Sequence, residues 1–183
     1  MWKQGGKMLW AVCFFLLVQI VPVFAQETKN ERVNFSSVYT DLSKDCSWAY
    51  KEKELQEGQD NALNCKGFGG YTGFIYFSAM GNHFTLKKGL NSQNYLLSNA
   101  IPIKNYEKGI IEWRLANNVP FAIIARGPES FEPEGPKGEI LFIRGIGKYS
   151  GINLQIDVSK NRNPNEEARK LADNGYFASE KDR

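Results

Sequence analysis

The sequence predicts an α+β domain made mainly of antiparallel β-strands, with one short C-terminal helix and one disulfide. Two observations carry this prediction. Apolar and polar residues alternate with a period of two in several short segments, and turn residues separate these segments. A helix-start pattern occurs once, after residue 162. A curved sheet, a flattened barrel and a sandwich are all compatible with this pattern.

Four strands can be placed in two hairpins and two more follow them. Residues 71–87 contain aromatic and branched runs on either side of Gly81-Asn82, which predicts a hairpin. In residues 110–126, Ile111, Trp113 and Leu115 alternate with polar or small neighbours, and Asn117-Asn118 suits a tight turn. Residues 127–138 read as an exposed loop. Further strands are expected at 139–144 and around Ile152, Leu154, Ile156 and Val158.

The C-terminal helix has clear boundary signals. Asn163 can cap the first turn, Pro164 suits the first helical position, and Glu166 favours the positive end of the helix dipole. Asn174-Gly175 predicts its end, giving about ten residues. A helix of this length does not persist alone, so we expect it to dock on the sheet.

The first 25 residues predict a cleavable signal peptide. Lys3 and Lys7 precede an apolar run from Met8 to Val23, and Val23-Phe24-Ala25 suits cleavage before Gln26. An uncleaved anchor is the alternative, although the run is shorter than the ~20 residues that span a bilayer. The prediction is a flexible leader at 26–35, a single domain at 36–178 and a disordered tail at 179–183. No membrane span is expected after cleavage.

Cleavage removes Cys13 and leaves Cys46 and Cys65. An even cysteine count in an exported chain favours a disulfide between them, with two free thiols or a redox pair as the alternative. The stretch 44–64 between and around them is dense in charge and reads as a solvated loop with at most one helical turn. Loss of Lys3 and Lys7 nearly balances basic and acidic residues, so no nucleic-acid partner is expected.

Four segments occur in an order that resembles a family of small exported bacterial proteins without established activity. They are Ser36–Leu42, Cys46 … Cys65-Lys-Gly-Phe-Gly-Gly-Tyr71, Ile111-Glu-Trp-Arg-Leu115 and Asn163–Asp173. The resemblance implies a bacterial source and a secreted or periplasmic location. It supplies no substrate and no catalytic residue. Extra cysteines near the C-terminal helix, frequent in that family, do not occur in this sequence.

No catalytic or metal-binding pattern stands out, so we expect no cofactor. The single histidine, His83, lies beside a predicted turn and is expected to be exposed. Glu112 and Arg114 flank Trp113 and form a possible partner-binding clamp; the structural alternative is a solvent-facing strand or an ion pair with a neighbouring strand. An aromatic set is expected in the core, although exposed members would suit sugars or a protein partner: Tyr71, Phe74, Tyr76, Phe77 and Phe84.

Two functional classes remain. The favoured one is a non-enzymatic envelope module that binds, inhibits or structurally supports a partner, either another envelope protein or a cell-wall glycan. The alternative is an extracellular or cell-wall hydrolase that uses surface carboxylates, which requires two acids to converge in a cleft.

Overall fold

The computed structural model describes residues 32–51, 61–79, 81–89, 96–97, 99–132 and 134–181. The predicted signal peptide, residues 1–25, lies outside these ranges, as does the leader up to residue 31.

Within the described residues, ten strands form two antiparallel five-stranded sheets. The first, here called the helix sheet, has the order β1 (Phe35–Asp41), β7 (Ile110–Ala116), β8 (Val119–Pro128), β9 (Glu139–Gly145), β10 (Asn153–Asp157). The second, here called the disulfide sheet, has the order β2 (Cys46–Trp48), β3 (Ala62–Cys65), β4 (Tyr71–Ser78), β5 (Gly81–Lys88), β6 (Ile101–Ile103). The predicted mainly antiparallel α+β class is confirmed.

The inner faces of the two sheets share one hydrophobic core. Trp113 and Ile123 from the helix sheet belong to the same buried cluster as Ile75 and Phe84 from the disulfide sheet. Trp113 is fully buried, and its indole N–H donates to Thr40 Oγ1 at 2.9 Å, which satisfies the one polar group of the ring. Two separate sheets around one core make the sandwich the correct alternative among the three.

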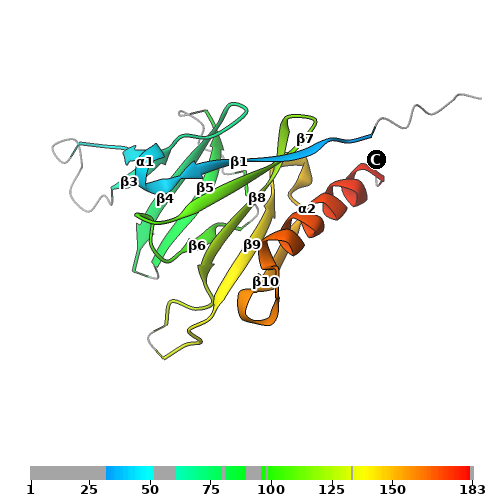
Figure 1. Ribbon diagram of the computed structural model, residues 1–183. Helices are drawn as coiled ribbons and strands as arrows, with labels where there is room; N and C mark the ends of the chain where they lie inside the picture. The colour runs from blue at the N-terminus through cyan, green and yellow to red at the C-terminus, as the bar shows by residue number, and fades with distance from the viewer. Residues whose placement is uncertain are drawn as a thin grey trace, which may run out of the picture. The chain divides into compact units, whose positions relative to one another are not determined.

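Helix α2 (Pro164–Lys181) covers the outer face of the helix sheet, where it contacts β8, β9 and β10 (Figure 1). Ala168 and Ala172 are fully buried in a second core with Leu141 and Ile143. Two alanines on the packed stripe let the helix approach the sheet closely. Because the helix sheet is buried on both faces, β8 and β9 read as continuous apolar runs and not as alternating ones.

The helix is longer than predicted. It has 18 residues and continues through Gly175 to Lys181, so the predicted end at Asn174-Gly175 is wrong, as is the disordered tail for residues 179–181. A Cβ at Gly175 would lie 2.9 Å from Cγ1 of Ile152. The glycine therefore serves close packing of the helix, while aromatic contacts of the next residues, Tyr176 and Phe177, hold the last turns.

The start of the domain also lies earlier than predicted. Val33 and Phe35, placed in a flexible leader by the sequence, pack against the outer core. The ring of Phe35 contacts those of Phe121 and Phe177 at centroid distances of 5.8 and 5.4 Å. The same segment is tied to the β7–β8 turn, because the backbone N–H of Asn34 donates to Asn117 Oδ1.

The two predicted hairpins are confirmed as β4–β5 and β7–β8. Asn117 and Asn118 have positive φ angles of 49° and 64°, as the turn between β7 and β8 requires. The turn of the first hairpin comes earlier than expected, since Gly81 already pairs with Ser78 as the first residue of β5.

Two stretches differ from the sequence prediction. The expected loop at 44–64 contains the end of α1 (Leu42–Asp45) and strands β2 and β3; residues 52–60 lie outside the described ranges. Local charge density concealed these strands, whose buried anchor is Leu63. In β10, Ile156 is buried as predicted, but Leu154 is 39% exposed.

Cys46 and Cys65 are direct cross-strand neighbours at the start of β2 and the end of β3, and they form the predicted disulfide. Their Cα atoms lie 4.0 Å apart. The bond fixes the short strand β2 at the edge of its sheet.

Candidate functional site: a charged cleft between the helix and the sheet

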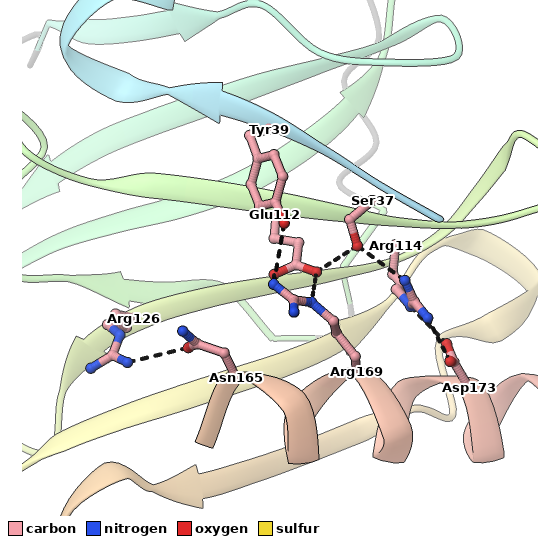
Figure 2. A network of polar contacts seen from close by, with 8 residues as sticks. All are labelled: Ser37, Tyr39, Glu112, Arg114, Arg126, Asn165, Arg169 and Asp173. Atoms are coloured by element: carbon pink, nitrogen blue, oxygen red, sulfur yellow. Dashed lines mark hydrogen bonds and ion pairs between the residues drawn. The ribbon is translucent and has the colours of Figure 1, made fainter. Parts of the chain in front are cut away.

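The outer face of β7 carries Glu112 and Arg114, and both side chains point toward helix α2 (Figure 2). Strand β1 runs beside β7 in a register that pairs Tyr39 with Glu112 and Ser37 with Arg114. Polar side chains from two strands therefore meet those of the helix on one surface.

The first ion pair joins Glu112 to Arg169. Arg169 Nε donates to Oε1 at 2.6 Å and Nη2 donates to Oε2 at 3.1 Å. Glu112 is only 7% exposed, and its Oε1 also accepts from the Ser37 hydroxyl at 2.6 Å. The hydrogen bond to Glu112 raises the pKa of the Arg169 guanidinium, which stays charged. Both carboxylate oxygens of Glu112 are thus already engaged by donors.

The second ion pair joins Arg114 to Asp173 one helical turn further on. Arg114 Nε donates to Oδ1 at 2.7 Å and Nη2 donates to Oδ2 at 2.6 Å. Its Nη1 donates to the Ser37 hydroxyl oxygen at 3.1 Å, and the guanidinium lies over the ring of Phe35. Ser37 therefore links the two pairs into one network that ties β1, β7 and α2 together.

These placements bear on the predicted partner clamp. Trp113 is fully buried in the inner core and offers no surface to a partner. Glu112 and Arg114 form ion pairs, as in the structural alternative, but with the helix and not with a neighbouring strand. Residues two apart on a strand are separated by about 6.7 Å, and residues four apart on a helix by about 6 Å. The spacing of Glu112 and Arg114 on the strand thus matches the spacing of Arg169 and Asp173 on the helix, and the charges are opposite at each position. The sequence therefore contained a signal for these two ion pairs.

Beside the Glu112–Arg169 pair the surface opens into a cleft of about 470 Å³. Its floor includes the apolar side chains of Ile124 and Leu141 from the helix sheet. One wall is the N-terminal part of α2, with Asn165 and Arg169, and another is the segment 104–109 that connects β6 to β7.

The rim of this cleft is positively charged. Arg126 Nη1 lies 3.1 Å from Glu139 Oε2, and its Nη2 donates to Asn165 Oδ1 at 3.2 Å. This pair is solvent-exposed on both sides and therefore weak. Lys104 and Lys108 line the same cleft, are exposed, and form no ion pair with any residue that the structure describes. The cleft thus has two lysines whose charge is not balanced locally.

His83 lies away from this cleft. The prediction that it is exposed is wrong, because its ring is half-buried. Its ring stacks on Tyr76 at 5.3 Å and contacts Phe131 at 5.5 Å. Phe131 comes from the loop that follows β8 and also covers Gly81. The exposed loop predicted at 127–138 begins later than expected, because Gly127 and Pro128 are buried residues of β8. The histidine is therefore half-buried in an aromatic contact that holds this loop against the β4–β5 hairpin.

One repeated motif was missed in the sequence. Asp-x-Ser-Lys occurs at 41–44 and at 157–160, at the ends of β1 and β10. In both copies the aspartate accepts hydrogen bonds from the serine N–H and hydroxyl and pairs with the lysine at 2.7 or 2.6 Å. The lysine, followed by the serine, lowers the pKa of Asp41 and of Asp157 to about 2. The motif ends both edge strands of the helix sheet with a capped helical turn.

Within the described ranges, no cluster of three or more His, Cys, Asp or Glu side chains has the geometry of a metal site. None of the described helices has the length and apolarity needed to cross a membrane. Comparison of the chain with protein-family models, with curated proteins and with solved structures found no match. The resemblance to small exported bacterial proteins stays a prediction from the sequence.

Proposed function

We propose that this chain is an exported, non-enzymatic module that binds an anionic group of an envelope component in the cleft beside α2. The observation that carries the proposal is the charge arrangement of this cleft. Both oxygens of its buried carboxylate, Glu112, are engaged by Arg169 and Ser37, whereas Lys104 and Lys108 at the rim have no described acidic partner. A carboxylate or phosphate group entering the cleft would neutralise the lysines and could compete with Glu139 for Arg126.

Export is supported by the signal-peptide pattern of residues 1–25 and by the Cys46–Cys65 disulfide, a bond that persists in oxidising compartments. Mass spectrometry of the product recovered from the periplasm or the medium tests this part. A mature N-terminus near Gln26 is expected. A product that retains residues 1–25 in the membrane fraction would contradict it.

The binding part is tested by titrating ¹⁵N-labelled protein with inorganic phosphate and citrate as probes. We expect shift changes at 104–109 and at Arg126, and weaker binding in the variant Lys104→Ser/Lys108→Ser. Lys88→Ser, on β5 of the disulfide sheet, is the matched control and should bind as the unmodified protein does. Equal binding by the double variant, or no shift change in the cleft, would refute the proposal.

A hydrolase that uses carboxylates is the second candidate, because Glu112 and Glu139 line the same cleft. It requires an acid that is free to exchange a proton with the substrate. The engaged oxygens of Glu112 argue against this role. Turnover of purified cell-wall polysaccharide that disappears in Glu139→Gln would favour the hydrolase over the binding module.

A further inference from the structure

Trp48 is the most exposed tryptophan among the described residues, with 55% of its surface accessible. It lies at the end of the edge strand β2. One face of its indole packs on Phe77 at a centroid distance of 5.6 Å, and Phe77 in turn meets the ring of Tyr106 edge-on at 5.4 Å. Three rings from three separate segments thus form a contiguous aromatic surface, here called the Trp48 platform.

The platform is held by more than side-chain packing. Cys46, two residues before Trp48, is bonded covalently to β3, and Trp48 itself pairs with Leu63 in the β2–β3 ladder. A three-residue edge strand would otherwise be weakly held. The backbone that carries Trp48 is therefore restrained, and Phe77 supports one face of the indole, which reduces the conformational entropy lost when a ligand stacks on it.

A hollow of about 340 Å³ adjoins the platform. Leu42 and Leu63 form its apolar base, and Ser43, Ser47 and Glu107 line it as polar residues. Asn105 Oδ1 accepts from the backbone N–H of Glu107 at 2.8 Å and fixes the turn that presents this residue. Within the described parts of the chain, the carboxylate of Glu107 and the hydroxyl of Ser47 form no hydrogen bond, so both remain available.

We propose that the Trp48 platform and this hollow bind a pyranose unit of an oligosaccharide. The axial C–H bonds of a pyranose ring form an apolar face that suits the negative face of an indole. The ring hydroxyls, at its periphery, need acceptors and donors, which the Glu107 carboxylate and the Ser47 hydroxyl supply. A purely apolar partner surface would leave the Glu107 carboxylate desolvated and unpaired, which is costly.

This site is distinct from the charged cleft, although the segment 104–109 borders both. Lys104 and Lys108 line the cleft, whereas Tyr106 and Glu107 line the hollow. The saccharide proposal therefore goes beyond the anion-binding one, and each can fail alone.

Tryptophan fluorescence tests it directly. The other tryptophan in the described part of the chain, Trp113, is fully buried. A sugar that stacks on Trp48 should therefore change only the fluorescence emission of the exposed Trp48. The exported protein is titrated with a β-1,4-linked N-acetylglucosamine tetramer and, separately, with a glucose tetramer of the same linkage. We expect saturable changes in emission with at least one probe. Trp48→Phe, which retains a ring, identifies the part of the signal that comes from Trp48.

Binding is then measured by calorimetry in Trp48→Ala, Glu107→Gln and the control Phe177→Ala, whose exposed ring lies on α2. Trp48→Ala should weaken binding at least ~10-fold, which corresponds to about 1.4 kcal/mol, while Phe177→Ala leaves it unchanged. Near-ultraviolet circular dichroism verifies the fold of each variant. The proposal is overturned by absent binding of both probes, by equal affinity in Trp48→Ala, or by a concentration-dependent dimer that buries Trp48.

Discussion

Arg169 on helix α2 donates hydrogen bonds to both carboxylate oxygens of Glu112 on strand β7, with N–O distances of 2.6 and 3.1 Å. The pair fixes the helix on the sheet and at the same time forms one end of the cleft. Its geometry is bidentate, which gives an Arg–carboxylate pair orientation as well as energy. Stability and the shape of the candidate binding site therefore depend on the same contact.

Breaking this pair on the arginine side should be costly. Arg169→Met leaves the carboxylate of Glu112 buried with Ser37 as its remaining partner. We expect the free energy of unfolding to fall by about 2–3 kcal/mol. This is less than the loss for a fully buried ion pair, because the Arg169 side chain is 37% exposed to solvent.

The matching measurement is a double-mutant cycle in urea with Glu112→Gln. The double variant should recover part of the loss, giving a coupling energy above about 1 kcal/mol. Additivity within about 0.3 kcal/mol would show that the two residues do not stabilise each other.

Gly175 lies inside the helix, where alanine is intrinsically favoured over glycine by about 1 kcal/mol. Gly175→Ala should nevertheless destabilise the protein by about 1 kcal/mol, because the new Cβ would lie 2.9 Å from Ile152 Cγ1. Thermal unfolding checks this, with exposed Asn174→Ala as the control that should stabilise. In an Ile152→Ala background, which removes Cγ1, the penalty should shrink; a penalty that persists undiminished would place its cause elsewhere.

The disulfide spans 19 positions of sequence and fixes the edge strand β2. Removing it with Cys46→Ser/Cys65→Ser should lower the free energy of unfolding by about 3 kcal/mol in the chain-entropy account. Urea titration of the oxidised protein, the reduced protein and the variant measures it. The reduced protein and the variant should agree; a stability equal to that of the oxidised protein would show that β2 needs no covalent restraint.

Acid should weaken the two Asp-x-Ser-Lys turns. Lys44 and Lys160 hold the folded pKa of Asp41 and Asp157 at about 2, below the ordinary value of 3.8. A carboxylate with a depressed folded pKa stabilises the fold above its unfolded pKa, and this contribution disappears as pH falls from about 4 through about 2.

The variant Asp41→Asn/Asp157→Asn should therefore be less stable at pH 7 and lose less stability between pH 4 and pH 2 than the unmodified protein. Urea midpoints at pH 7, 4 and 2.5 give the comparison, with Glu134→Gln in the exposed loop as the control. Parallel pH profiles for the unmodified protein and the double variant would rule out this role of the turns.

Much of the fold was predictable from local patterns. The alternation in β7, the Asn117-Asn118 turn and the helix start at Pro164 each depend on neighbours within a few residues, and each is confirmed. The Cys46–Cys65 bond followed from cysteine count and context. Predictions went wrong where a distant contact overrides a local preference, as at Gly175, which faces Ile152, and at His83, which is covered by Phe131.

The candidate sites show the same division. Glu112 and Arg114 were visible as charged neighbours on one strand, but not their bonds to Arg169 and Asp173, about sixty residues later. Trp48 lies in the stretch 44–64, which the sequence predicted as a charged loop, and only the packing of three distant segments makes it part of a platform.

By itself the sequence determined the mainly antiparallel class, the hairpins and the disulfide. Periodicity and turn chemistry depend on residues close together in the chain, and the disulfide followed from the number of cysteines. The tertiary structure alone decided that two sheets enclose the core, how far the helix runs, and which charges remain unpaired. Those properties arise from contacts between segments far apart in the chain, whose free energy no local pattern encodes.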